Sequence, residues 1–569
     1  MAKMWTFGRG SALGLGAVAG AAALLCASFG AQAQTLKESY ADFEQKEYIP
    51  GTLPDAAGSA PVIGLSMSVV IGFEGPSQYN AASFGRNFIP PDTMGAVGKT
   101  QYMATTNGAY GIYDKATGTA LRLQSDVSFW AGAGQTGAFG DSRILYNAAA
   151  GRWVVISLGA SFSDTQIAVS RTDNALGPWQ SVKYTGFAGG AFGGVADYPT
   201  LALDKNAVYI GTNNFNCSNA ACSLASFEGT TLNVIPIDSL FSGGAPTVAG
   251  MKQFVTPFTG VGPPVDGDRG FAIQGVMGNP LVGTGKIVAN SVFDPDNLAF
   301  TVNGLTSSSA TVATLSPTTL LGVTTLVDAG PARQPSVAIP ANRRVIDAFD
   351  QRISSNVYES QGKLFSVQTV DGGSDFARVR YTIVDATTLA ILDEGDIGTG
   401  AFDYFQGSIA VNAGGRGVVG YNRSGATTAD LNGDGLSDGN VSFFEQSFYV
   451  GPDGKLHFFG AETLLKAGLT DDYHNGSTFG NPAAGRQRWG DYSQVSIDPL
   501  DGNNFWLIGE FAREYNNAAG GHPGGTGGSR WGTFIAEVSV VPEPSSWALL
   551  GLGLAGMATW SKRRKLQAA

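Results

Sequence analysis

Histidine and cysteine are scarce in this chain, and their scarcity excludes several kinds of chemistry. Only 3 His and 3 Cys occur among 569 residues. The histidines stand apart from one another, at His457, His474 and His522. Because a zinc site takes its ligands from closely spaced His and Cys residues, a His-based metal centre is not expected.

Charge is also sparse, and most of it is acidic. Charged residues make up 14% of the sequence, and 35 Lys and Arg stand against 46 Asp and Glu, for a formal net charge of −11. An acidic surface repels phosphate backbones. No local basic patch interrupts the acidic body of the chain, so nucleic acid is not an expected partner.

Long hydrophobic runs are missing from the interior, and the apolar runs lie near the two ends. The first 33 residues read MAKMWTFGRG, then SALGLGAVAGAAALLCASFG, then AQA. A basic start, an apolar stretch and small residues form the pattern of a secretory signal peptide. We expect signal peptidase to cut between Ala33 and Gln34, which removes Cys26. An uncleaved N-terminal anchor is the alternative.

Export leaves two cysteines, Cys217 and Cys222, in the segment NFNCSNAACSL. In an oxidising compartment, a close pair in such a loop predicts a local disulfide. Two free thiols are the alternative.

The C-terminal tail is the second unusual segment. Residues 541–569 read VPEPSSWALLGLGLAGMATWSKRRKLQAA. The uncharged stretch from Trp547 to Trp560 would rise about 21 Å as a helix, short of the ~30 Å hydrocarbon core, although its flanks extend it. We expect a short transmembrane segment over about 547–560, with the basic KRRK cluster held on the cytoplasmic side.

This tail closely resembles the PEP-CTERM sorting signal of exported proteins in Gram-negative, biofilm-forming bacteria. The resemblance covers Val-Pro-Glu-Pro, the short apolar segment and the basic end. It implies handling by exosortase at or near Pro542, Glu543 and Pro544, with transient retention in the inner membrane. The mature protein would then reach the cell surface or the extracellular matrix. A permanent C-terminal anchor is the alternative.

The body between the two ends has the composition of an all-β protein. It is rich in glycine and aromatic residues, with 80 Gly, 33 Phe and 18 Tyr in the chain, which favours short strands and tight turns. A phrase of strand, turn and strand recurs, which is typical of a β-propeller. Six copies begin at Pro90, Gly140, Ala196, Phe349, Tyr404 and Trp489, and a weaker one begins at Gly267.

Seven starts favour seven blades, with six or eight as close alternatives and an array of β-sandwiches as the main rival. We expect a leader and the start of the propeller at 34–85, the propeller body at 86–540 and the sorting signal at 541–569. The segment SRTDNALGPWQSV loosely resembles the aspartate-box turns of sialidase-like propellers. The resemblance implies that Asp173 caps a turn and that Trp179 packs between sheets.

The segment DLNGDGLSDGN is a candidate calcium loop. Asp430, Asn432, Asp434 and Asp438 stand at loop positions 1, 3, 5 and 9, and Leu436 offers a backbone carbonyl at position 7. This spacing gathers the oxygen ligands that Ca²⁺ prefers, although Val441 replaces the usual glutamate at position 12. A polar turn without an ion is the alternative. We expect Ca²⁺ to have a structural role.

Acidic residues also recur where the innermost strands of a propeller would begin. The weak catalytic candidates are Asp141, Asp197 and Asp491, with Arg143 and Arg488 nearby, and Asp92, Asp350 and Arg352 occupy similar places. They could form an acid/base pair for glycoside hydrolysis. Regular recurrence favours the other reading, in which the carboxylates cap turns. The leading expectation is therefore a propeller that binds polysaccharide or another matrix component, and the alternative is a glycosidase or sialidase-like enzyme.

Overall fold

The computed structural model describes residues 65–542, except for 87, 138–139, 220–221, 223–224, 259–266, 336–344, 374, 471–472, 474–486 and 515–529. The signal peptide, the leader up to residue 64 and the tail from Glu543 onward lie outside the described residues. Strands dominate the described part. The all-β prediction is therefore confirmed.

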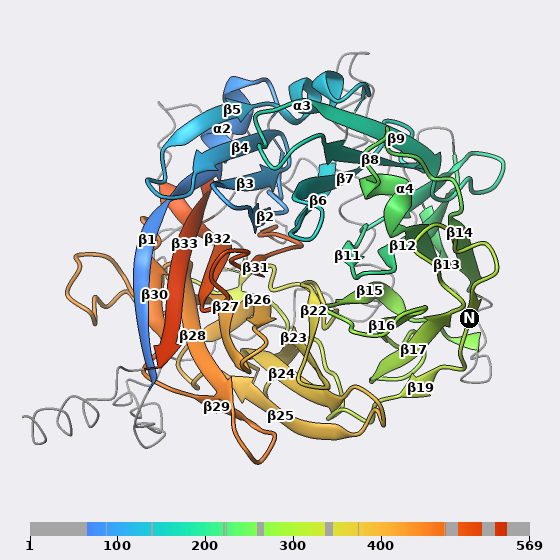
Figure 1. Cartoon of the computed structure of the whole chain (residues 1–569). Coiled ribbons are helices and arrows are strands. Elements are labelled where there is room, and N and C mark those ends of the chain that lie inside the picture. Colours follow the sequence, from blue (N-terminus) through green and yellow to red (C-terminus); the bar gives the residue numbers. More distant parts are fainter. Residues whose placement is uncertain are drawn as a thin grey trace, which may run out of the picture.

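The first three sheets follow one another along the chain (Figure 1). One contains β2 (Met94–Val97), β3 (Gln101–Thr106), β4 (Ala109–Asp114) and β5 (Ala120–Gln124). The next contains β6 (Gly140–Asn147), β7 (Arg152–Leu158), β8 (Asp164–Ser170) and β9 (Trp179–Thr185). The third contains β10 (Gly194–Asp197), β11 (Ala202–Leu203), β12 (Ala207–Cys217), β13 (Ala225–Pro236) and β14 (Lys252–Pro257).

A nine-stranded sheet comes next and consists of two antiparallel halves. One half contains β15 (Phe271–Met277), β16 (Thr284–Asn290), β17 (Asn297–Asn303), β18 (Thr314–Leu315) and β19 (Thr319–Leu320). The other contains β22 (Val357–Ser360), β23 (Lys363–Asp371), β24 (Ala377–Asp385) and β25 (Ile391–Ile397). Only a short parallel pairing of β15 with β22 joins the halves. The pair β20 (Ala332–Arg333) and β21 (Val345–Ile346) lies between them in the sequence.

The last two sheets complete the body. One contains β26 (Asp403–Val411), β27 (Arg416–Ser424), β28 (Ser442–Val450), β29 (Leu456–Phe458) and β30 (Thr463–Lys466). The other contains β31 (Gln494–Ile497), β32 (Asn504–Glu514), β33 (Arg530–Pro542) and β1 (Leu65–Ser77). The helices are short: α2 (Gln78–Ser83), α3 (Asp126–Gly132) and α4 (Ile237–Phe241). None of the described helices could cross a bilayer.

The sheets form a ring, with the first strand of each sheet nearest the centre (Figure 1). Neighbouring first strands contact one another, since β2 contacts both β6 and β31, and β26 contacts both β22 and β31. β1 closes the ring, because this early strand pairs antiparallel with β33 from Leu65 opposite Pro542 to Ser77 opposite Gly532. The predicted leader segment at 34–85 thus contributes the outermost strand of the last sheet.

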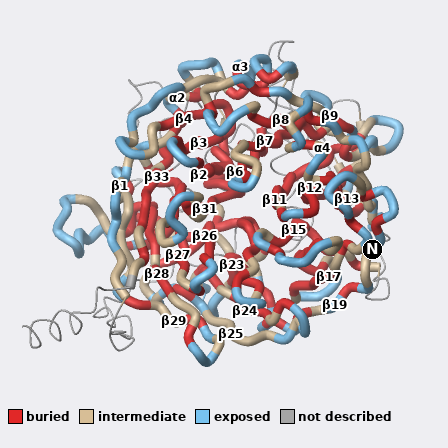
Figure 2. Tube along the Cα trace, viewed as in Figure 1, coloured by how far each residue is buried: buried red, intermediate tan, exposed pale blue. Residues whose placement is uncertain are grey.

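Burial follows position within each sheet, as Figure 2 shows. The second and third strands are almost wholly buried, as in β7 and β8, because another sheet packs against each of their faces. Fourth strands are more exposed, and β14 alternates between half-buried and exposed residues. Ile156, Ile167, Val208 and Ile210 form part of an apolar cluster between the second and third sheets. The core is therefore divided among the spaces between sheets.

The aspartate-box segment folds differently from its expectation. Asp173 is exposed and lies 3.7 Å from Lys99 Nζ. The turn is held instead by Asn174, whose Oδ1 accepts the Leu176 amide hydrogen at 2.9 Å. Trp179 does pack against Phe129, with ring centroids 5.0 Å apart. The tryptophan therefore packs against helix α3, and the aspartate side chain does not cap the turn.

Candidate functional site

A residue in the left-handed backbone region recurs at the head of the innermost strand. The residues are Asp92, Asp141, Tyr198, Ala272, Phe349 and Gln406, with φ between 50° and 71°. This conformation is costly for residues other than glycine, by about 1–3 kcal/mol each. Irregular strand pairing brackets Asp141, Ala272 and Gln406, so these residues stand in β-bulges. The same backbone irregularity thus recurs at similar points of successive sheets.

Side chains of the preceding sheet hold these turns in place. Asn107 Oδ1 accepts the Asp141 amide hydrogen at 2.9 Å, and Asn213 Oδ1 accepts that of Ala272 at 3.0 Å. Thr369 Oγ1 accepts the amide hydrogen of Gln406 at 3.2 Å. Each bond satisfies a buried donor and ties one sheet to the next. The repeated acidic positions are therefore part of the connections between sheets.

The structure brings all five catalytic candidates together around the axis, and it buries them. Asp141 is 6% exposed and Arg143 is fully buried. Asp197, Asp491 and Arg488 are buried too, as are Asp92, Asp350 and Arg352. Buried Glu510, on β32, joins this group electrostatically. Glu510 lies on the second strand of its sheet, where no repeated phrase of the sequence marks it.

Two arginines of this axial cluster are paired with carboxylates. Both Asp350 oxygens accept hydrogen bonds from Arg352, through Nε at 2.5 Å and through Nη2. Arg488 Nη2 donates to Asp491 Oδ1 at 2.5 Å, and its Nε lies 3.6 Å from Asp347 Oδ2. Bidentate and network ion pairs of this kind fix the geometry of buried charges.

Other polar side chains reach across the axis. Arg143 Nη1 donates to the Ser354 carbonyl oxygen at 2.9 Å, and its guanidinium lies 3.7 Å from the Tyr492 ring centroid. The Tyr198 hydroxyl donates to the Asp491 carbonyl oxygen at 3.2 Å. The middle of the ring is therefore filled by hydrogen-bonded side chains from non-adjacent sheets.

Carboxyl groups outnumber arginines in this cluster, and the pKa values of several of these carboxyl groups are raised. Burial, followed by repulsion from Asp491, raises the pKa of Asp141 to about 6. Burial and neighbouring carboxylates also raise the pKa values of Asp92, Asp197 and Glu510 well above their ordinary ranges. The cluster therefore keeps several protons at neutral pH, so part of it consists of neutral carboxyl groups.

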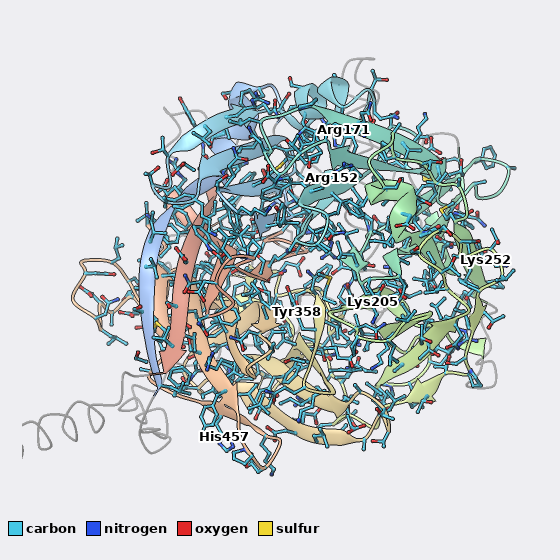
Figure 3. The ribbon with its side chains drawn as sticks, in the orientation of Figure 1. Arg152, Arg171, Lys205, Lys252, Tyr358 and His457 are labelled. Carbon is cyan, nitrogen blue, oxygen red and sulfur yellow. A yellow bond between two sulfur atoms is a disulfide. The ribbon has the colours of Figure 1, made fainter. Side chains whose placement is uncertain are left out.

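A cavity of about 610 Å³ opens at the other end of the innermost strands. Its walls come from six of these strands, and they include apolar Val97, Leu145 and Tyr358 and polar Gln361 and Ser496. Figure 3 shows Tyr358 near the centre of the ring. Its hydroxyl donates to the Val495 carbonyl oxygen at 3.1 Å, which joins β22 to β31. Small-molecule sites commonly have volumes of about 300–1,000 Å³.

The cavity was not predicted from the sequence. The charged residues that recur in the sequence mark the beginnings of the innermost strands, whereas the cavity lies at their ends. The available signal was the set of small or apolar residues that end these strands, such as Val97, Met277 and Val411.

The candidate calcium loop is wound tightly around Asp430. Its carboxylate accepts amide hydrogens from Gly433 at 2.7 Å, Asp434 at 3.1 Å and Gly435 at 2.9 Å. Asp438 turns elsewhere, since its Oδ1 lies 3.3 Å from Arg423 Nη2 and its Oδ2 accepts the Leu431 amide hydrogen at 2.6 Å. The described residues contain no cluster of three or more His, Cys, Asp or Glu arranged as a metal site.

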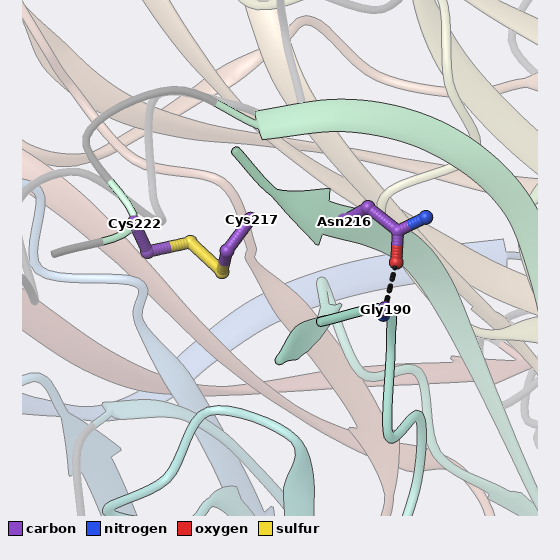
Figure 4. Close-up of a disulfide and its surroundings, with 4 residues drawn as sticks. All are labelled: Gly190, Asn216, Cys217 and Cys222. Atoms are coloured by element: carbon purple, nitrogen blue, oxygen red, sulfur yellow. Dashed lines mark hydrogen bonds between the residues drawn. A yellow bond between two sulfur atoms is a disulfide. The ribbon is translucent and has the colours of Figure 1, made fainter. Parts of the chain in front are cut away.

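The described residues include the cysteine pair and the first residue of the sorting motif. Cys217 and Cys222 form a disulfide with their Cα atoms 4.7 Å apart (Figure 4). The preceding Asn216 Oδ1 accepts the Gly190 amide hydrogen at 2.8 Å. Pro542 is the last residue of β33. Glu543, Pro544, Ala33 and Gln34 lie outside the described residues.

A family profile for the PEP-CTERM protein-sorting motif matches residues 540–565. The tail is a PEP-CTERM sorting motif. It implies export, processing by exosortase and sorting toward the cell surface through a membrane-anchored stage. No curated protein matches the chain.

Several solved structures resemble the body distantly. A protein of unknown function from Dyadobacter fermentans is 9% identical, with 83% of this chain and 99% of that chain covered and a TM-score of 0.36. Cobalt-substituted Synechocystis apocarotenoid oxygenase is 10% identical, with 67% and 72% covered and a TM-score of 0.36. A mutant Trypanosoma rangeli sialidase with trans-sialidase activity is 11% identical, with 68% and 52% covered and a TM-score of 0.31. Similarities this weak carry no argument about activity.

Proposed function

We propose that the body is a seven-bladed β-propeller that binds an extracellular ligand after export. The sheet order supports seven blades, because the nine-stranded sheet divides at the short β15–β22 pairing. β1 would then be the outer strand that closes the ring. Pairing the first and last segments of the chain in one sheet ties the two ends of the body together.

The ligand is polysaccharide or another matrix component, and the cavity at the ends of the innermost strands receives it. The cavity is the observation that carries this proposal. Its apolar walls suit the C–H faces of a sugar, and Gln361, Ser360 and Ser496 suit its hydroxyl groups. Because the tail directs the protein to the cell surface, polysaccharide is a ligand that it would meet there.

The rival function is glycoside hydrolysis by the axial carboxylates, as in a sialidase-like enzyme. Catalysis needs two carboxyl groups that a substrate can reach, spaced about 5–10 Å apart. Asp141, Asp197 and Asp491 are buried, and side chains that cross the axis surround them. This burial favours a structural role for the cluster and a binding role for the protein.

A glycan array combined with analysis of the bound glycans separates these functions. The exported, processed protein should retain one class of glycan, and the recovered glycans should have their original length. If the parent protein yields shortened glycans and the Asp141→Asn variant does not, the protein is a hydrolase.

We also propose that the loop from Asp430 to Asp438 binds structural Ca²⁺. Asp430, Asn432 and Asp434 would supply side-chain oxygens, and Leu436 would supply its carbonyl oxygen. The hydrogen bonds from backbone amides to the Asp430 carboxylate support this assignment, because they fold the first half of the loop around that carboxylate. Asp438 would have to exchange its contact with Arg423 for the ion. The ion would stiffen the connection between β27 and β28.

Sorting would proceed in two stages. The segment over about 547–560 would hold the exported chain in the inner membrane of a Gram-negative cell, with KRRK on the cytoplasmic side. Exosortase would then act at Pro542-Glu543-Pro544 and release the propeller to the surface or to the biofilm matrix.

A further inference from the structure

The ring has two ends, and the sorting tail leaves from one of them. In the last sheet, β31 runs toward the cavity, β32 returns, and β33 runs toward the cavity again. The Val540 amide donates to the Asn503 carbonyl oxygen at 2.9 Å, within the turn that follows β31. Pro542 therefore lies at the end of the ring where the innermost strands finish. We call this end the exit face and the opposite end the entry face.

Only a short connection separates the exit face from the apolar tail. The chain from Pro542 to Trp547 spans at most about 18 Å when fully extended, at 3.3–3.6 Å per residue. Pro542 is also fixed to the body, because it is paired with Leu65 of β1. A tail held in a bilayer would keep this part of the exit face close to the lipid headgroups.

Exposed apolar side chains project from turns at the exit face. Val282 is 83% exposed, Val312 is 76% exposed and Leu500 is 67% exposed. These residues belong to the turns between β15 and β16, between β17 and β18, and between β31 and β32. Apolar side chains on turns at one end of a soluble domain can enter the interfacial region of a bilayer.

The charges at this end also suit an anionic surface. Arg152, Arg171, Lys205 and Lys252 lie at the exit face over the second and third sheets, on one side of the ring in Figure 3. None of the four forms an ion pair with a carboxylate among the described residues. Arg171 donates instead to the carbonyl oxygens of Gly243 and Gly244.

Several acidic residues at the exit face form hydrogen bonds or ion pairs within the protein. Asp204 accepts hydrogen bonds from Tyr209 and Asn279, Glu359 pairs with Lys286 at 2.8 Å, and Asp498 pairs with Lys115. At the entry face, Asp294, Asp375, Asp430 and Asp434 are exposed. Asp173, Asp453 and Asp501 are exposed at the exit face, where Asp173 lies 3.7 Å from Lys99 Nζ and Asp453 lies 3.0 Å from His457 Nε2.

We propose that the exit face lies against a membrane surface of anionic phospholipid headgroups until the tail is cut. This inference rests on the proposed sorting pathway. The cavity opens on the same face, so the membrane would cover it before processing. Ligand binding would then begin only after the body is released.

Site-specific quenching tests this orientation. The exported, uncleaved chain is placed in vesicles that contain anionic phospholipid and a quencher attached to lipid headgroups. A fluorophore is attached through Val282→Cys, Leu500→Cys or Phe192→Cys. Phe192 is 56% exposed in the loop between β9 and β10, at the entry face, and serves as the matched control. The native Cys217–Cys222 disulfide does not compete for the label.

We expect quenching at Val282→Cys and Leu500→Cys to exceed that at Phe192→Cys at least threefold. Equal quenching at the three positions, or greater quenching at Phe192→Cys, would overturn the proposal. Combining Arg152→Glu, Lys205→Glu and Lys252→Glu should at least halve the difference in quenching between the exit-face labels and the Phe192→Cys label. Lys183→Glu, near the entry face, should leave this difference unchanged. If the triple variant leaves the quenching difference unchanged, the basic residues do not hold the exit face against anionic lipid.

Two readouts distinguish this inference from the proposed processing: quenching in the same vesicles and release from cells. With Pro542→Ala, Glu543→Ala and Pro544→Ala combined, the quenching difference should persist, because these changes leave the connection short. Release from cells that still occurs with this variant would refute exosortase handling while leaving the orientation intact. Loss of the quenching difference in the unaltered chain would refute the orientation alone.

Discussion

The Tyr492 hydroxyl donates a 3.2 Å hydrogen bond to Asp141 Oδ2 across the axis of the ring. This bond joins the last sheet to the second sheet, and the two residues are 351 positions apart. The Tyr492 ring also lies under the Arg143 guanidinium. One tyrosine therefore links a buried carboxyl group and a buried cation at the point where the ring closes.

Removing this hydroxyl should destabilise the whole body. Tyr492→Phe keeps the ring but leaves Asp141 Oδ2 without its donor, which should lower the free energy of unfolding by about 1–3 kcal/mol. Urea denaturation of the processed protein measures the change. Tyr79→Phe, at an exposed residue of α2, is the control and should remain within about 0.5 kcal/mol of the parent. Equal stability of the two variants would show that the Tyr492 bond contributes nothing.

Stability should fall as the pH rises from 5 to 8. The folded-state pKa of Asp141 is about 6, above its value of about 3.9 in an unfolded chain. A raised folded-state pKa gives stability that is present below the unfolded pKa and is lost as the pH rises through the folded pKa. At about 1.4 kcal/mol for each unit, Asp141 contributes about 3 kcal/mol in all, of which about 1.4 kcal/mol is lost between pH 5 and 8. Asp92, Asp197 and Glu510 act in the same direction.

Unfolding in urea at several pH values checks this dependence. Asp141→Asn should flatten it, since asparagine cannot ionise and tolerates the left-handed backbone at this position. A protein that is more stable at pH 8 than at pH 5 would contradict the assignment of neutral carboxyl groups to the axis.

The buried pair of Asp350 and Arg352 should be among the most sensitive points of the body. Both side chains are fully buried. Asp350→Asn would leave the guanidinium with a neutral partner, at a cost of about 3–5 kcal/mol. Asp294→Asn, at an exposed carboxylate, controls for the loss of one charge and should have little effect on the melting temperature. If the two variants melt together, the ion pair is not a structural element.

Calcium removal should loosen the loop between β27 and β28. We expect EDTA to lower the melting temperature of the processed protein by several degrees and added Ca²⁺ to restore it. In Asp430→Ala, the melting temperature should no longer respond to either reagent. A parent protein that melts at the same temperature in EDTA and in Ca²⁺ would rule out the site.

Processing should depend on Pro542, Glu543 and Pro544. With Pro542→Ala, Glu543→Ala and Pro544→Ala combined, the protein should remain in the membrane fraction, and the amount released should fall at least tenfold. Fractionation and immunoblotting measure the distribution. Replacing Ser545 and Ser546 by alanine provides the matched control, for which normal release is expected.

Local patterns in the sequence located much of the fold. The phrases that begin at Pro90, Gly140 and Ala196 coincide with β2, β6 and β10, because alternating residues and tight turns are local signals. Closure by Leu65–Ser77 had no such signal, since its partner strand lies more than 450 residues away. The pairing of β1 with β33, which completes the ring, is visible only in the three-dimensional structure.

The candidate site was predictable in its residue types but not in its environment. The recurring acidic residues do gather at the axis. In two sheets, however, the left-handed position belongs to the neighbouring aromatic residue, Tyr198 beside Asp197 and Phe349 beside Asp350. Burial and cross-axis bonds depend on contacts between distant sheets, which spacing along one strand does not encode. The cavity escaped prediction for the same reason.

Ligand binding by a variant that blocks the cavity tests the central claim most directly. Ala413 is exposed at the cavity rim, and Ala149 is exposed outside it. Against the glycan that the array identifies, Ala413→Trp should weaken binding by the processed protein at least tenfold, whereas Ala149→Trp should leave it unchanged. Binding that both variants retain would place the ligand elsewhere and contradict the account.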